Sequence, residues 1–188
     1  MAARFGYLDI CRLIIENVKN KNPADIVGDT PLHKASGNAH LDVCRLIIEN
    51  VTNKNPKNER GWTPIHTAAM SGNLEVYKLI IENAKDKNPT DKFGFRPLHH
   101  AVLNGHLDVC KLIIENVADK NPANNDGKTP LHKAAKCGHL NICKLILENV
   151  EDKNPTDNHG KTPKDLACNK KILRLFGEAE SHNENWNW

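Results

Sequence analysis

The chain has 188 residues, of which 39% are hydrophobic and 26% are charged, and its formal net charge is +3. This composition supplies apolar material for a packed core, but no apolar run approaches the roughly 18 residues of a membrane-spanning helix. The pI near 8.5 lies below the value of about 9 above which a domain is typical of nucleic-acid binders. The first residues lack the basic, apolar and small-residue order of a signal peptide, so we expect an intracellular, cytoplasmic protein.

A short motif returns along the chain at intervals of 33 residues. It begins with "GDTPLHKA" at Gly28, and close copies begin at Gly61, Gly94 and Gly127, with a diverged copy, "GKTPKDLA", at Gly160. A fixed period of this length is typical of proteins that stack one structural repeat upon the next.

Each period predicts two short helices followed by a loop. In the best-preserved copy, Thr129 is a suitable N-cap, Pro130 a suitable first helical residue and Gly138 a suitable end. Apolar residues then recur with helical spacing over residues 140–147, and Asn154-Pro155 ends the second helix and starts an extended loop. One such helix pair cannot bury its apolar face alone, so neighbouring repeats must cover it.

The motif G-x-T-P-L-H-x-A, followed by "GHL" and "LII", resembles the ankyrin-repeat family over about residues 1–176. The resemblance implies an all-α fold, an ankyrin-type solenoid of stacked helix-turn-helix units joined by extended hairpin-like loops. It also implies a non-enzymatic scaffold that binds another protein, with the loops, here called fingers, and the first helices forming the concave binding surface.

The repeat boundaries predict one solenoid domain in seven parts. These are a truncated first repeat (1–24), four full repeats (25–57, 58–90, 91–123 and 124–156), a C-terminal capping repeat (157–176) and a disordered tail (177–188) that includes Trp186 and Trp188. The first repeat lacks the Thr-Pro start, which leaves Ile10, Leu13 and Ile14 without cover. We therefore expect a fragment of a longer array, or an N-terminal end that frays or self-associates, and otherwise a monomer.

Two further patterns concern stability. Ala39 replaces the glycine found in phase at Gly6, Gly72, Gly105 and Gly138, and a left-handed residue there costs about 1–2 kcal/mol when it is not glycine. Alternatively, Gly37 and Asn38 nearby let the turn shift. Cysteines 11, 44, 110 and 143 share another phase, which predicts reduced thiols that act as small buried hydrophobic groups.

Histidines in the fourth place of the motif recur at His33, His66, His99 and His132. A residue repeated in every copy is expected to hold the turns, whereas a metal site needs three or four ligands that converge at one place. No catalytic motif is present, so we predict no enzyme activity, no metal and no cofactor.

The repeat motif does not dictate the residue types at the finger tip and at the end of the first helix. The middle repeats carry large apolar residues there, and basic residues follow them. These candidate partner-binding residues are Trp62, Phe93, Phe95, Met70 and Leu103, with Lys128, Lys133, Lys136 and Lys161. They predict binding of a protein or an extended peptide with an acidic rim. Alternatively, the rings fold back between neighbouring fingers and stabilise the stack.

Two other functions compete with this prediction. The basic C-terminal repeats could bind nucleic acid or anionic lipid, with a steep salt dependence. The family resemblance also suggests a substrate of an asparaginyl hydroxylase, with candidate positions at Asn22, Asn55, Asn88, Asn121 and Asn154. Each of these is followed by proline where alanine is usual.

Overall fold

The computed structural model describes the backbone of residues 1–183 and the side chains of residues 1–177. The chain forms two compact units, Met1–Lys92 (unit 1) and Phe93–Trp188 (unit 2). Over the described residues every regular element is a helix. Each unit is therefore built from the helix pairs that the 33-residue period predicts.

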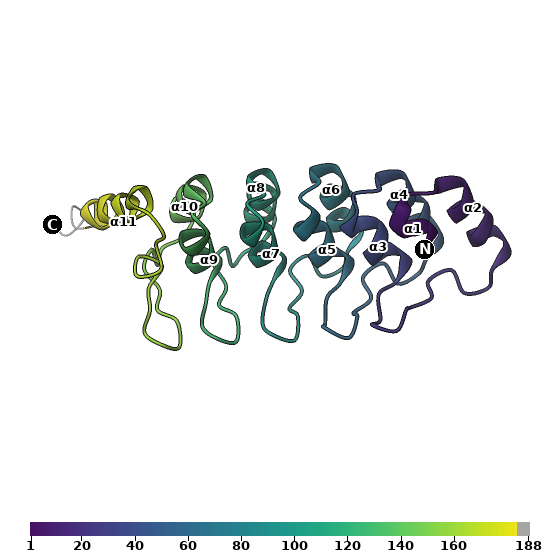
Figure 1. Cartoon of the computed structure of the whole chain (residues 1–188), viewed down its shortest axis with the longest axis horizontal. Coiled ribbons are helices and arrows are strands. Elements are labelled where there is room, and N and C mark those ends of the chain that lie inside the picture. Colours follow the sequence, from purple (N-terminus) through teal and green to yellow (C-terminus); the bar gives the residue numbers. More distant parts are fainter. Residues whose placement is uncertain (184–188) are drawn as a thin grey trace. The chain divides into compact units, whose positions relative to one another are not determined.

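Unit 1 contains three helix pairs: α1 (Ala2–Phe5) with α2 (Leu8–Asn17), α3 (Pro31–Gly37) with α4 (Leu41–Asn50), and α5 (Pro64–Ser71) with α6 (Leu74–Asn83). First helices pack on first helices, since α3 contacts both α1 and α5. Second helices form a second row, in which α4 contacts α2 and α6 (Figure 1). Within unit 1 the pairs thus stack in chain order.

Unit 2 continues the pattern with α7 (Pro97–Leu103) and α8 (Leu107–Asn116), then α9 (Pro130–Cys137) and α10 (Leu140–Leu147). Helix α9 contacts α7, and α10 contacts both α8 and the last helix, α11 (Lys170–Asn183). In the capping repeat the first helix is reduced to a turn, and α11 buries Ile172 and Phe176. This helix therefore closes the apolar face of α10, as expected of a cap.

Helix α11 also reaches further than the sequence suggested. Its backbone is helical to Asn183, which includes the start of the segment 177–188 that we expected to be a disordered tail. The segment contains Glu178, Ala179 and Glu180, residue types with high helix propensity that continue an existing helix at little cost. Trp186 and Trp188 lie outside the described residues.

The core of each unit consists of residues in equivalent positions of successive repeats. The motif leucine or isoleucine is at most 1% exposed at Leu32 and Ile65 in unit 1 and at Leu98 and Leu131 in unit 2. The cysteines of the shared phase, Cys11, Cys44, Cys110 and Cys143, are buried as predicted. Burial raises the thiol pKa of Cys44, Cys110 and Cys143 to about 12, so these side chains pack as neutral apolar groups.

The fingers are joined by regular backbone hydrogen bonds. In unit 1 the Glu59 N–H donates to the Val27 carbonyl (3.1 Å), and the Lys92 N–H donates to the Arg60 carbonyl (3.0 Å). In unit 2 the Asn158 N–H donates in the same register to the Asp126 carbonyl (3.0 Å). Within each unit, backbone hydrogen bonds therefore align neighbouring fingers, in addition to the packing of the helices.

Helix α2 has the uncovered apolar stripe that the truncated first repeat predicts. Ile10, Leu13 and Ile14 are 49%, 62% and 46% exposed, whereas Val43 and Ile47, the counterparts of Ile10 and Ile14 on α4, are each 1% exposed. The stripe is exposed because no preceding helix pair lies against it in unit 1.

Ala39 itself adopts the left-handed conformation, with φ at 62°, whereas Asn38 has φ at −108°, so the turn does not shift to the neighbouring residues. The glycine at this place lies against the next repeat: a Cβ on Gly6 would come within 2.5 Å of the His40 ring, and one on Gly105 within 2.9 Å of His139. In the same register Ala39 faces Asn73, a smaller residue than histidine. Unit 1 thus has space for the methyl group but retains the backbone strain.

We predict that Ala39→Gly raises the free energy of unfolding by roughly 0.5–1 kcal/mol, the strain relieved less the added chain entropy of glycine. The reverse change at the equivalent turn, Gly105→Ala, should destabilise by more than about 1 kcal/mol because it adds both strain and a contact with His139. Urea unfolding of the three chains measures both effects. A loss of stability in Ala39→Gly would contradict the strain argument.

Candidate functional site

The motif histidine links each repeat to the following finger. In unit 1 the Thr30 backbone N–H donates to His33 Nδ1 (3.1 Å), so Nδ1 is the unprotonated nitrogen of the ring. The proton is then on Nε2, which donates to the Trp62 carbonyl (3.0 Å). His33 is 1% exposed. One neutral ring therefore closes the start of its own helix and holds the tip of the next finger.

The same arrangement occurs twice in unit 2. The Arg96 and Thr129 backbone N–H groups donate to Nδ1 of His99 and His132, each at 3.1 Å. Nε2 of His99 donates to the Lys128 carbonyl (3.1 Å), and Nε2 of His132 donates to the Lys161 carbonyl (3.0 Å). These histidines have the turn-holding role that their repetition predicts.

The capping repeat has Asp165 in the place of this histidine. Its carboxylate accepts the Thr162 backbone N–H (2.9 Å), and the Asp165 N–H donates to the Thr162 hydroxyl (3.2 Å). Asp165 thus reproduces the Nδ1 half of the histidine contact, but a carboxylate has no counterpart of the Nε2–H donor. Within the described residues no further finger follows that would need such a donor.

Burial controls the charge of the bridging rings. Loss of solvent lowers the pKa of both His33 and His132 below the ordinary value of 6.5. The neutral tautomer required by the two hydrogen bonds is therefore also the one that burial favours. Across the described residues, no three His, Cys, Asp or Glu side chains gather closely enough to hold a metal ion.

The two candidate residues of unit 1 differ in exposure. Trp62 is half-buried, its indole N–H donates to the buried Asp91 carboxylate (3.0 Å), and Arg60 lies over the ring 5.5 Å from its centroid. Met70 at the end of α5 is 36% exposed. The Trp62 ring thus contacts the neighbouring finger, as the alternative structural interpretation expects, while Met70 faces solvent.

Unit 2 contains the other three apolar candidates. Phe93 on its finger is 61% exposed and Leu103 at the end of α7 is 51% exposed. Phe95 is half-buried, with its ring 5.2 Å from His99 in an edge-on arrangement and 5.9 Å from His100. Two phenylalanines only two residues apart therefore differ: Phe93 is mostly exposed, and Phe95 packs on the first helix.

The basic candidates also belong to unit 2. Lys133 Nζ lies 5.2 Å above the Phe95 ring, and the pKa of Lys133 is lowered by burial and by repulsion from Lys128 and Lys136. Lys128 lies 3.9 Å from the Asp157 carboxylate, whereas Lys136 and Lys161 are exposed. The face around Phe95 thus carries an excess of positive charge.

The equivalent position in unit 1 is neutralised. Lys34, three periods before Lys133, forms ion pairs with Asp25 (3.0 Å) and Asp29. In the repeat of Lys133, these two acidic residues are replaced by Asn124 and Lys128. Two substitutions on the finger therefore change the formal charge of this cluster from −1 (one lysine with two aspartates) to +2 (two lysines with one asparagine).

The asparagines considered for hydroxylation hold the loops after the second helices. Asn22, Asn55, Asn88, Asn121 and Asn154 each donate their backbone N–H to an Asn or Asp side chain two residues earlier, at 2.9–3.2 Å. The Asn22 and Asn55 amides also reach carbonyls of the next loop, Asn53 and Asp86, at 3.5 and 3.4 Å. These contacts give the recurring asparagines a structural role, and their modification stays a prediction.

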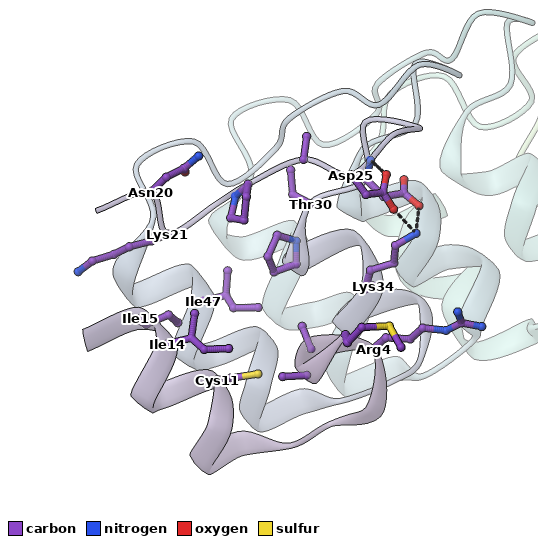
Figure 2. A pocket seen from close by; sticks show the side chains of 17 residues that line it. Arg4, Cys11, Ile14, Ile15, Asn20, Lys21, Asp25, Thr30, Lys34 and Ile47 are labelled. Atoms are coloured by element: carbon purple, nitrogen blue, oxygen red, sulfur yellow. Dashed lines mark hydrogen bonds and ion pairs between the residues drawn. The ribbon is translucent and has the colours of Figure 1, made fainter. Parts of the chain in front are cut away.

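A groove of about 460 Å³ lies at the N-terminal end of unit 1. Figure 2 shows Cys11, Ile14, Ile15 and Ile47 on one side of it, and Lys34 with Asp25 near the other. Asp29, the second ion-pair partner of Lys34, also lines the groove. The sequence predicted the exposed stripe on α2 but not this groove.

Within residues 1–183, no helix combines the length and the apolar character needed to span a bilayer. Comparison with protein families finds matches to a model described as ankyrin repeats (3 copies) at residues 1–91, 50–124, 78–159 and 98–184. No curated protein matched the chain. The family matches together extend over nearly the whole sequence.

Loss of the hydrogen bond from a motif histidine to the following finger should lower the free energy of unfolding. The equivalent exchange at the last repeat, which has no such bond, should have little effect. His132→Asp keeps an acceptor for the Thr129 N–H but loses the donor to the Lys161 carbonyl, so we expect about 1–3 kcal/mol of destabilisation. Asp165→His, the matched exchange, should change stability by less than about 0.5 kcal/mol because Asp165 is exposed. Urea unfolding compares the two; equal losses would contradict a bridging role.

The buried rings also predict loss of stability in mild acid. Because the folded-state pKa of His33 and of His132 lies below 6.5, the unfolded chain binds protons first as the pH falls. Their stabilisation is complete above about pH 6.5 and is lost as the pH falls through the folded-state pKa values. We expect the urea midpoint to fall between pH 7.5 and pH 5; a flat profile would contradict neutral, depressed rings.

The aspartate carboxylates affect stability in a lower pH range than the histidines. The Lys34 hydrogen bond lowers the pKa of Asp25, and the Lys161 backbone N–H lowers that of Asp157, in both cases below 3.8. Stabilisation from these groups is therefore retained down to about pH 3.8. A decline that begins near pH 6.5 belongs to the histidines.

Proposed function

Because the chain belongs to the ankyrin-repeat family, whose repeats are generally protein–protein interaction modules, we propose that it binds a protein or an extended peptide through its fingers and first helices. The proposal assigns it no enzymatic activity and no cofactor. The surface that best supports this function is in unit 2, around Phe93, Phe95 and Leu103.

The observation that carries the proposal is the exposure of Phe93 and Leu103. A finger residue and a first-helix residue of one repeat are both more than half exposed, at positions that the repeat motif leaves variable. The Phe93 side chain is 61% exposed, so a partner can reach it. Exposed aromatic and aliphatic groups of this kind are typical of binding sites.

The charges beside these residues indicate the character of the partner. Lys133 and Lys136 project from α9, and Lys128 and Lys161 lie on the two fingers next to it. Repulsion among Lys128, Lys133 and Lys136 is relieved when an anionic group approaches, which favours acidic side chains on the bound protein. Association should therefore be faster at low salt.

In unit 1 the proposal assigns Met70 and the half-buried Trp62 to the same function. The Trp62 indole N–H is already bonded to Asp91, which fixes the ring plane and lowers the entropy lost when a partner packs on it. Nucleic acid or anionic lipid remains the alternative for the basic residues of unit 2. Salt dependence distinguishes them, since counterion release makes such binding fall steeply with salt.

We predict that the double change Phe93→Ala/Leu103→Ala reduces capture of the native partner from source-cell lysate by at least about tenfold. Its far-ultraviolet circular dichroism should not change, because both side chains are exposed. The matched control is Ile26→Ala, which removes an apolar side chain that is 95% exposed on a finger of unit 1 and should leave capture intact.

Quantitative mass spectrometry of the captured proteins at 50 and 500 mM salt gives the comparison. Equal capture by the wild-type and Phe93/Leu103-substituted chains would exclude this surface. Capture of nucleic acid or vesicles that disappears at 500 mM salt and is insensitive to the Phe93/Leu103 change would favour the alternative.

A further inference from the structure

Neighbouring fingers of unit 1 are joined by polar side chains at one position of the repeat. Asn58 Nδ2 donates to the Asp29 carboxylate of the preceding finger (2.7 Å). One repeat later, the Asp91 carboxylate accepts the Trp62 indole N–H (3.0 Å). At this position the side chain therefore has a polar partner on the finger before it.

Unit 2 has such a contact in one repeat and lacks it in another. The Asp157 carboxylate lies 3.9 Å from Lys128 Nζ. In the repeat before it, the position belongs to Asn124, and the residue in phase on the preceding finger is Phe95, whose ring has no oxygen or nitrogen atom. Asn124 is 6% exposed, and within the described residues its Nδ2 is buried without a hydrogen-bond partner. A buried donor without an acceptor is unfavourable, so an acceptor supplied from outside gains free energy.

The orientation of the Asn124 side chain is fixed by its other polar atom. Oδ1 accepts the backbone N–H groups of Asp126 (3.1 Å) and Lys128 (2.8 Å). Asn58 Oδ1 accepts the equivalent two N–H groups, both at 2.9 Å, while its Nδ2 faces the preceding finger. Exchange of the amide oxygen and nitrogen of Asn124 would break two hydrogen bonds, so its amide donor also faces the preceding finger.

Lys133 is a second donor at the same place. Its Nζ lies 5.2 Å from the centroid of the Phe95 ring, the group opposite Asn124 in the repeat pattern. In unit 1 the equivalent lysine, Lys34, lies 3.0 Å from the carboxylate of Asp25, which is in phase with Asn124. A lysine at this position is thus long enough to share an acceptor with the side chain at the position of Asn124.

Unit 1 shows which acceptor such donors take. The Asp29 carboxylate accepts Asn58 Nδ2 through Oδ1 and Lys34 Nζ through Oδ2. The two oxygens of one carboxylate therefore satisfy an asparagine amide and a lysine ammonium at once. In unit 2 the residue in phase with Asp29 on the finger before Asn124 is Phe95, so the chain itself supplies no carboxylate at that position.

We propose that Asn124 Nδ2 and Lys133 Nζ form a carboxylate-binding site that accepts one Asp or Glu side chain of the bound peptide. The inference rests on the function proposed above and specifies one contact of that surface. Phe93, two residues before Phe95 on the same finger, is 61% exposed. We therefore expect the bound segment to carry an acidic residue next to an apolar one.

The charges around Lys133 favour an anion. Burial and repulsion from Lys128 and Lys136 lower the pKa of Lys133, whereas Cys137 and Asp126 act in the opposite direction. A bound carboxylate offsets the repulsion among the three lysines, because it attracts each of them.

Access to the amide of Asn124 requires a side chain to move. Nδ2 is buried, and Lys133 and Phe95 are both half-buried. The lysine stem is flexible, so its ammonium can follow an anion. The bound carboxylate therefore replaces the contact of Lys133 with the Phe95 ring by an ion pair.

The test uses the ¹⁵N-labelled full chain, with sodium acetate as the probe and sodium chloride withdrawn to keep the ionic strength constant. We expect a saturable shift of the Asn124 side-chain amide resonance, with a dissociation constant on the order of 10 mM. The Asn58 side-chain amide, whose acceptor Asp29 is part of the chain, is the internal control and should not shift. No saturable shift at Asn124, or an equal shift at Asn58, would overturn the proposal.

Inorganic phosphate at the same ionic strength distinguishes a carboxylate site from a phosphate site. Phosphate should bind less than about tenfold more tightly than acetate, because the site offers one amide and one ammonium donor. A larger preference would overturn the assignment to Asp or Glu in favour of a phosphorylated side chain.

Matched variants locate the site. Asn124→Asp places a carboxylate where unit 1 has Asp25, so Lys133 should pair within the chain and acetate affinity should fall by about tenfold or more. Asn125→Asp makes the same change of charge on the same finger and should lower the affinity by less than about threefold. Equal losses in the two chains would overturn the site in favour of a general effect of charge.

A second pair of variants tests the ammonium group. Lys133→Gln should weaken acetate binding by about tenfold. Lys144→Gln removes the same charge from an exposed residue of α10 and should change the affinity by less than about twofold. An unchanged affinity in Lys133→Gln would contradict the assignment of this lysine.

The acetate titration also separates this site from the proposed function. The Phe93→Ala/Leu103→Ala chain should bind acetate normally. Acetate binding at Asn124, together with partner capture that is insensitive to Phe93 and Leu103, would overturn the proposed function and retain the carboxylate site. Capture that depends on Phe93 and Leu103, without an acetate shift at Asn124, would retain the function and overturn the site.

Discussion

The structure depends on one buried histidine in each of the four full repeats, which within each unit links its own helix to the finger of the following repeat. Nδ1 of His33 or His132 accepts the backbone N–H at the start of its own helix, and Nε2 donates to a carbonyl of the following finger. The ring is at most 1% exposed at both positions, so an unmade bond at either nitrogen would cost the desolvation of a buried polar group. The hydrogen bonds of each of these histidines are therefore all formed only when the following finger is folded, which couples the folding of one repeat to that of the next.

Much of this arrangement could be predicted because it depends on residue types with few conformational options. Proline begins α3, α5, α7 and α9 as predicted, and Gly138 ends α9 with φ at 82°. For Ala39 the sequence left two possibilities, a strained left-handed residue or a shifted turn, and the structure has the first. The histidine acceptors could not be predicted in the same way, because they are backbone carbonyls and carry no sequence signature. The different environments of Phe93 and Phe95 depend on the path of one finger, which a 33-residue period does not specify.

The surface charge shows how a stable scaffold can vary its binding properties. Lys34 and Lys133 occupy one position of the repeat, yet Lys34 pairs with Asp25 and Asp29, whereas Lys133 lies among Lys128 and Lys136. The residues that differ lie on the finger and do not enter the core, so their exchange changes the electrostatic field without altering the helix contacts. Core packing and surface charge thus depend on different positions of the same period, so the charge around the first helix can change from one repeat to another while the helix contacts stay the same.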